Sequence, residues 1–240
     1  MMTKMLFTAM LISLGFLVFS TAADAYLPSK VFKVFTSVLF ILTAISGYLS
    51  SPKSKSYFRL ILSGLVFSLF GDFFLSMTEF KFMFEIGFAS FLIAQLIYIV
   101  AFSSLSKITP LDFAVMLPFC VPPFIIIYTL KGFDFDGMLP LIIAYTLMIA
   151  FMCSKAISLR KLRHSSPFAV WLTIAGAVLF FMSDFILLFV YYYNKSHFIL
   201  PYLNLTAYYI AQGLIALSFL RGIESDRTSQ KTPEKIKPFV

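Results

Sequence analysis

Two aspartates lie deep inside long apolar stretches of the chain, where a charged side chain is costly. Asp72 and Asp184 occupy such positions, whereas the rest of the eleven acidic residues lie in polar connections, near the ends of apolar stretches or in the C-terminal segment. A carboxylate at the middle of a membrane span costs about 2.5–3.5 kcal/mol, so such residues usually face a bundle interior and have a function. We therefore take both aspartates as candidate catalytic residues. The alternative is a structural hydrogen bond between helices.

Two carboxyl groups that share a pocket of low dielectric constant can divide the roles of acid and base. Both cannot ionise cheaply, so one keeps a proton that it can donate, while the other acts as a base or stabilises a cation. This arrangement suits reactions through an oxocarbenium-like state, such as the hydrolysis of a glycoside or of an enol ether. It also suits proton coupling in a transporter of small molecules or lipids, which is the main alternative.

Other common chemistries lack their residues in this sequence. Neither histidine, His164 or His197, lies in an apolar stretch, which argues against an intramembrane zinc site with three histidines and against a Ser-His-Asp set. The sequence contains no HExxH motif and no glycine-rich phosphate loop. We expect no metal and no other cofactor, and a metal ion held by the two aspartates alone is the remaining alternative.

The surroundings of the two aspartates repeat along the chain. Residues 64–75, GLVFSLFGDFFL, align with residues 176–187, GAVLFFMSDFIL, at an offset of 112. The following apolar stretches align as well, because FLIAQ ends at Gln95 and YYIAQ ends at Gln212, an offset of 117. Matches of this kind at a fixed spacing indicate an internal repeat, which many membrane proteins contain.

The repeat predicts two tandem halves of four helices each, residues 1–108 and 109–222. Four spans is an even number, so the halves have parallel topology and both aspartates lie at similar depth in the membrane. Polar groups inside a membrane need partners, so we expect them to cluster. The expected cluster comprises Asp72, Asp184, Ser68, Gln95, Tyr98, Ser183, Tyr208, Tyr209 and Gln212.

The composition predicts an all-α polytopic membrane protein. Hydrophobic residues make up 60% of the 240 residues and charged residues 12%, compared with about 45–50% and about 25% in soluble domains. A span needs about 20 apolar residues, and eight stretches qualify, forming one membrane domain over residues 1–222 before a polar tail at 223–240. The predicted spans are 5–22, 31–49, 60–78, 82–102, 111–130, 138–154, 168–190 and 200–220.

The placement of basic residues predicts the orientation. With eight spans both termini share a side, and most of the nineteen Lys and Arg residues lie there, including those in the connection from Lys155 to His164. The positive-inside rule then puts both termini in the cytoplasm. We take the net charge of +8 as this signal rather than as a sign of nucleic-acid binding. As an alternative, Lys4, the first apolar stretch and residues 23–25 resemble a cleavable signal peptide.

The motifs around the aspartates resemble those of the YhhN family, the lysoplasmalogenases, which include the animal transmembrane protein 86 enzymes. The resemblance rests on GLVFSLFGD ending at Asp72, GAVLFFMSD ending at Asp184 and YYIAQ ending at Gln212, with Tyr145 as a further shared feature. It extends from the second span to the eighth. One departure is Gln95, where many relatives carry His.

The resemblance implies a reaction and a substrate. The family hydrolyses the vinyl ether bond of lysoplasmalogen to a fatty aldehyde and glycerophosphoethanolamine or glycerophosphocholine, without a metal or cofactor. The partners implied are this lysophospholipid and the bilayer, in the inner membrane of a bacterium or the endoplasmic reticulum of a eukaryote. Beside the catalytic Asp72 and Asp184, the residues expected to bind or orient the substrate are Ser68, Gln95, Tyr98, Tyr145, Ser183, Tyr208, Tyr209, Gln212 and Lys33.

Lys33 is a separate expectation, because it is a cation near the start of the second span. Such a side chain could contact the phosphate of a lipid. The alternative is that its amine only reaches the membrane interface while the aliphatic stem lies along apolar surface.

Overall fold

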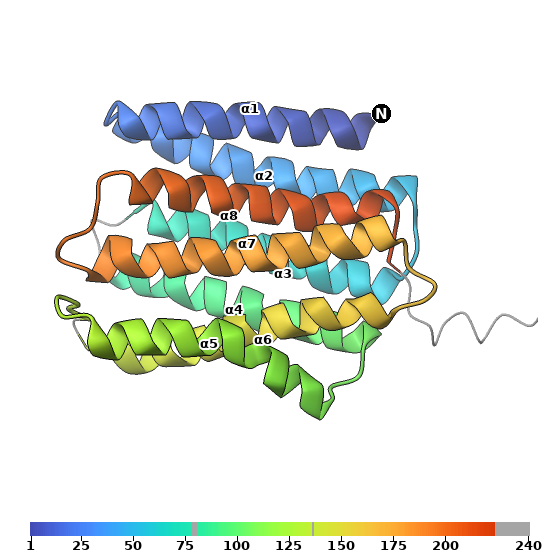
Figure 1. Cartoon of the computed structure of the whole chain (residues 1–240). Coiled ribbons are helices and arrows are strands. Elements are labelled where there is room, and N and C mark those ends of the chain that lie inside the picture. The colour runs from blue at the N-terminus through green and yellow to red at the C-terminus, as the bar shows by residue number, and fades with distance from the viewer. Residues whose placement is uncertain (78–80, 136, 224–240) are drawn as a thin grey trace, which may run out of the picture.

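The computed structural model of the chain is a bundle of long helices (Figure 1). The structure describes residues 1–77, 81–135 and 137–223. Within these residues β-structure is limited to one isolated bridge between Phe133 and Tyr193. The helices are α1 Met2–Ala22, α2 Tyr26–Ser50, α3 Lys55–Leu75, α4 Lys81–Leu105, α5 Pro110–Thr129, α6 Leu139–Ser158, α7 Pro167–Tyr192 and α8 Leu200–Leu217, with the short 3-10 turns η1 Leu159–Lys161 and η2 Ser218–Leu220 after α6 and α8.

Eight helices in the described residues are long and apolar enough to cross a membrane, with mean hydropathies from 1.4 to 2.2. This confirms the predicted all-α membrane protein with eight transmembrane helices. The predicted boundaries differ most from the structure at three helices. Helix α3 begins at Lys55 rather than at residue 60. Helix α2 begins at Tyr26, so Lys33 lies about two turns inside it. Helix α6 continues to Ser158, so Lys155 belongs to this helix rather than to a connection.

Helices that follow one another along the chain pack as neighbours: α1 with α2, α3 with α4, α5 with α6, and α7 with α8. Helix α2 also packs on α3 and α8, and α6 packs on α7 and α4. Exchanging α1 to α4 for α5 to α8 turns α1–α2 into α5–α6, α3–α4 into α7–α8, α2–α3 into α6–α7 and α2–α8 into α6–α4, as a tandem repeat requires. The packing of α1 on α8 departs from this pattern. The contacts are compatible with the predicted halves, 1–108 and 109–222, which stay a prediction.

Glycines allow close helix contacts at corresponding positions of these halves. A Cβ atom on Gly64 of α3 would lie 2.4 Å from the Tyr98 ring of α4. A Cβ atom on Gly176 of α7 would lie 2.7 Å from Ile215 of α8. Small residues let membrane helices approach closely. Since the two glycines differ by 112 positions and their partners by 117, the contacts match the offsets of the sequence repeat.

Helix α5 is bent and lies at the edge of the bundle (Figure 1). Pro118, Pro122 and Pro123 lie inside this helix. A proline within a helix removes a backbone hydrogen bond and clashes with the preceding turn, which kinks the helix. The bend brings the second part of α5 alongside α6, where Pro123 forms part of a cavity wall.

Both ends of the described chain lie at one end of the bundle, on the right of Figure 1. The connections from α1 to α2, from α5 to α6 and from α7 to α8 lie at the other end. The predicted tail lies outside the described residues from position 224 onward, and so do residues 78–80 of the connection between α3 and α4. The cytoplasmic placement of the two termini stays a prediction.

Candidate active site

A cavity of about 220 Å³ is lined by residues of seven helices, α2 to α8. It is near the end of the bundle opposite the chain ends, because its residues come from the last turns of α3 and α7 and the first turns of α4, α6 and α8. Most of the lining is aromatic or aliphatic. The polar lining residues are Lys33, Asp72, Tyr145, Thr146, Ser183, Asp184, Tyr191, Tyr192, Asn204 and Tyr208.

The Asp72 carboxylate accepts two hydroxyl hydrogen bonds on one oxygen. The Ser37 hydroxyl of α2 donates to Asp72 Oδ2 at 2.6 Å, and the Tyr208 hydroxyl of α8 donates to the same atom at 2.8 Å. Only 2% of the Asp72 surface is exposed. The Lys33 ammonium also attracts this carboxylate electrostatically. Hydrogen bonds and a nearby cation replace the water that burial removes.

Asp184 is half-buried rather than buried as expected, because its side chain forms part of the cavity wall. The Tyr145 hydroxyl of α6 donates to Asp184 Oδ2 at 2.6 Å. The Ser183 hydroxyl is 3.4 Å from Asp184 Oδ1, beyond the usual range for two oxygens. Asn204 Nδ2 of α8 donates to the Ser183 carbonyl at 2.8 Å and so fixes α8 beside α7. Asp184 thus has one short hydrogen bond and faces the cavity.

Three of the expected site residues form a separate group that does not line the cavity. The Gln212 side chain of α8 donates from Nε2 to Ser68 Oγ at 3.0 Å. Its Oε1 accepts a hydrogen bond of 3.0 Å from the Tyr98 hydroxyl. All three side chains are fully buried. They join α3, α4 and α8 and so position the helices that carry Asp72 and Tyr208.

Tyr209 and Gln95 also lie behind the cavity wall. The Tyr209 hydroxyl donates to the Lys33 backbone carbonyl at 3.0 Å, which joins α8 to α2. Gln95 is fully buried beside Tyr145, and its amide atoms make no hydrogen bond of normal geometry with the described residues. The expected single cluster therefore separates into residues that face the cavity and residues that support them.

Sequence analysis missed several polar residues of the site, among them Ser37 and Asn204. Ser37 lies one turn after Lys33 on α2, and Asn204 lies one turn before Tyr208 on α8. Residues four positions apart share a helix face, so this spacing could have indicated both. Lys33 itself lines the cavity together with the aspartates.

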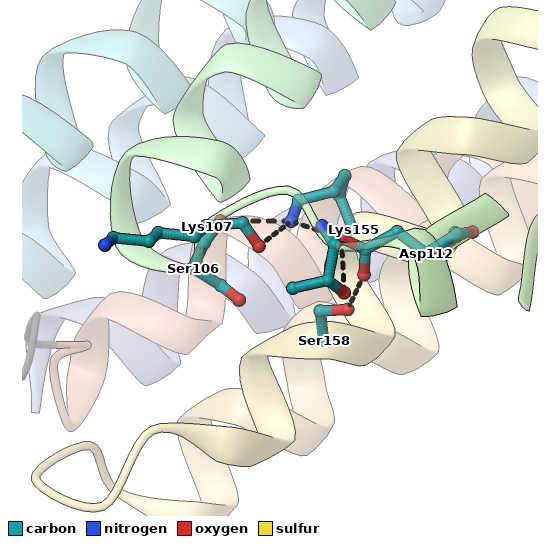
Figure 2. Close-up of polar contacts among 7 residues, drawn as sticks. Ser106, Lys107, Asp112, Lys155 and Ser158 are labelled. Atoms are coloured by element: carbon teal, nitrogen blue, oxygen red, sulfur yellow. Dashed lines mark hydrogen bonds and ion pairs between the residues drawn. The ribbon is translucent and has the colours of Figure 1, made fainter.

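A second buried carboxylate, Asp112, lies in the first turn of α5, at the end of the bundle that holds the chain ends. Figure 2 shows its polar contacts. Lys155 Nζ lies 3.1 Å from Asp112 Oδ2, and both side chains are buried. The same ammonium donates to the carbonyls of Ser106 and Lys107 at 3.0 Å each. Ser158 also donates to Asp112 Oδ1. Lys155, with three donors, thus has three acceptors, which explains why it lies buried in α6 rather than in a connection.

The fold and the cavity define a class: a polytopic α-helical membrane protein with two carboxyl groups facing a largely apolar cavity. In the described residues no three His, Cys, Asp or Glu side chains come together as a metal site would need. Residues 28–219 match the model of the YhhN family, and the chain belongs to that family. No curated protein and no solved structure gives a significant match.

Proposed function

We propose that this protein is an intramembrane hydrolase that cleaves the vinyl ether bond of lysoplasmalogen, releasing a fatty aldehyde and glycerophosphoethanolamine or glycerophosphocholine. The observation that carries the proposal is the presence of Asp72 and Asp184 on the wall of one largely apolar cavity. Membership of the YhhN family supports a hydrolase, because the motifs around these aspartates resemble those of lysoplasmalogenases.

The cavity wall suits a substrate with one hydrocarbon chain and a charged head group. Aromatic side chains such as Phe88, Phe181 and Phe185 line it and would surround the chain. The Lys33 ammonium lines the same space and would attract the phosphate of the head group. The reacting ether lies between the chain and the head group of such a lipid, and the two carboxyl groups would act there.

The reaction begins with transfer of a proton from one carboxyl group to the alkenyl carbon next to the chain. The double bond shifts toward the ether oxygen, and an oxocarbenium ion forms. The other carboxylate stabilises this cation by its charge and removes a proton from a water molecule that attacks the cationic carbon. The product of this step is a hemiacetal.

The hemiacetal then breaks at its bond to the glycerol oxygen. The carboxyl group that took the proton from water returns it to this oxygen, while the hemiacetal hydroxyl gives its proton to the first carboxylate. In the overall reaction, one vinyl ether and one water molecule are converted to one aldehyde and one alcohol. Both carboxyl groups return to their starting protonation states.

The test is aldehyde release from lysoplasmenylethanolamine by the purified full chain in detergent with EDTA. We expect wild type to turn over and both Asp72→Asn and Asp184→Asn to lose at least about 100-fold in kcat, since general acid–base catalysis contributes about 10²–10⁴-fold. Asp24→Asn is the matched control, because Asp24 is exposed between α1 and α2 with a positive φ of 49° that Asn also tolerates.

Isotope labelling tests the chemistry independently. In D₂O the aldehyde should carry one deuterium on the carbon next to the carbonyl, and in H₂¹⁸O the glycerol product should carry no label, because the bond that breaks joins the hemiacetal carbon to the glycerol oxygen. Absence of turnover by monodisperse wild-type protein would reject this substrate. Turnover without deuterium on that carbon would reject protonation of the alkenyl group.

A further inference from the structure

The two aspartates differ in the groups that stabilise a negative charge. Asp72 accepts short hydrogen bonds from Ser37 on α2 and from Tyr208 on α8. Lys33, on the same face of α2 as Ser37, attracts it as well. Hydrogen bonds donated to the charged form and an opposite charge nearby both favour ionisation of a carboxyl group. These groups favour the ionised form of Asp72.

Among the described residues, Asp184 has no counterpart of the cation Lys33, and one hydroxyl donor also differs between the two halves. Helix α6, which corresponds to α2 in the second half, supplies the Tyr145 hydroxyl to Asp184. In the first half, α2 supplies the Ser37 hydroxyl to Asp72. The sequence repeat, however, pairs Tyr208 with Phe91 at the offset of 117, and Phe91 has no hydroxyl to donate. Phe91 lines the cavity and its ring lies 5.7 Å from the Tyr208 ring. The second hydroxyl donor is therefore missing from the Asp184 side.

The charge on Asp72 adds to this difference. The two carboxyl groups interact electrostatically across the cavity, and a second negative charge beside the first is unfavourable. Among the described residues, the titratable or charged side chains that interact with Asp72 are Lys33, Tyr98, Tyr208, Tyr209 and Asp184, and those that interact with Asp184 are Tyr145, Cys153 and Asp72.

We infer that the two carboxyl groups have fixed and different roles, in which Asp184 holds the proton and is the acid, and Asp72 is ionised and is the base. The inference rests on the proposed function for the reaction, but the protonation states exist without substrate. Asp184 gives its proton to the alkenyl carbon and later regains one from the hemiacetal hydroxyl. Asp72 takes a proton from water and returns it to the glycerol oxygen. Ser37, Tyr208 and Lys33 act as positioning residues for the charge on Asp72.

Infrared spectroscopy tests these states directly. A protonated carboxylic acid has a carbonyl stretching band that a carboxylate lacks. The purified full chain in detergent at neutral pH, without substrate, should show this band. We expect Asp184→Asn to lose it, while Asp72→Asn and the exposed control Asp24→Asn keep it. Loss of the band in Asp72→Asn but not in Asp184→Asn would overturn the inference, as would loss in both or absence of the band from wild type.

A second pair of variants keeps both carboxyl groups and so avoids the risk that an Asn variant fails to fold. Tyr145→Phe removes the short hydrogen bond to Asp184 and should shift the wavenumber of the band. Tyr57 is a buried tyrosine of α3 that does not line the cavity, so Tyr57→Phe should leave the wavenumber unchanged. A band that moves in Ser37→Ala but not in Tyr145→Phe would overturn the inference. If the band behaves as expected and no aldehyde is released, the protonation states stand and the proposed function fails.

Discussion

The Tyr208 hydroxyl has a larger role than a typical buried tyrosine in a membrane helix. It donates to the carboxylate of Asp72 on another helix and lines the cavity. A hydrogen bond to a charged group contributes about 1.5–3 kcal/mol, roughly twice a neutral one. Tyr208 therefore affects both the packing of α8 and the charge state of the site.

We expect Tyr208→Phe to lower kcat for aldehyde release by about 10- to 100-fold, because loss of one such hydrogen bond at about 1.4 kcal/mol per tenfold change gives this range. The variant keeps the ring and should remain folded. Steady-state kinetics on lysoplasmenylethanolamine measure the effect, with Tyr57→Phe as the matched control. An unchanged kcat would show that the Tyr208 hydroxyl does not act on the reacting carboxylate.

The residues that sequence analysis could find at this scale are those that are costly in a membrane. Asp72 and Asp184 were conspicuous because a carboxylate in an apolar stretch needs a reason. Ser37 and Asn204 are uncharged, so their types carry a weaker signal than a carboxylate, and only the structure shows their partners. The half-burial of Asp184 depends on the packing of seven helices around the cavity, which its own neighbours in sequence do not reveal.

At the scale of helices, the Lys155–Asp112 pair fixes how α4, α5 and α6 meet. Asp112 also caps the start of α5 by accepting from the Thr109 backbone N–H at 2.7 Å, and Lys155 binds the last carbonyls after α4. The end of α4 and the start of α5 are thus held against α6 by charged groups whose hydrogen bonds are satisfied. Sequence analysis ended the sixth span before Lys155, because Lys155 is the first of the basic residues in the run to His164 that was taken as the connection to the seventh span.

Removing one member of this pair should destabilise the protein. We expect Lys155→Met to lower the free energy of unfolding by about 3–5 kcal/mol, because Asp112 would be left as a buried charge without its counterion. The matched control is Lys107→Met, whose side chain is exposed at the same end of the bundle. Thermal unfolding in detergent measures both. An equal loss in the two variants would show that the pair contributes no more than a surface charge.

The combination of Lys155→Met with Asp112→Asn gives a further check. Both charges are then absent, so the double variant should lose less stability than the sum of the two single losses. A fully additive loss would mean that the two side chains act independently, in conflict with their 3.1 Å separation.

For the whole molecule, the fold class and the number of spans could be predicted from composition and the length of apolar stretches, because a bilayer sets the length of a helix. The orientation depends on charges outside the bundle, and the structure contains no membrane to test it. The cavity lies at the end away from the chain ends, so the positive-inside rule predicts that it lies in the non-cytoplasmic half of the bilayer.

Labelling of single cysteines in intact cells tests this orientation. Ser196→Cys is exposed in the connection from α7 to α8, and Lys161→Cys is exposed in η1 at the opposite end. A membrane-impermeant maleimide should label the first in intact cells and the second only after permeabilisation. The unmodified chain is the control, because its cysteines Cys120 and Cys153 are buried. The reverse pattern would place the cavity on the cytoplasmic side.

The contacts of α8 also determine when the site can form during synthesis. Helix α8 packs on α1 and α2 and gives Tyr208 to Asp72, yet it leaves the ribosome after the seven other described helices. Until it inserts, Asp72 is already in the membrane with Ser37 but without Tyr208. A chain that stops before α8 would therefore leave the Asp72 carboxyl group without its second hydroxyl donor, so that insertion of α8 and completion of the site are a single event.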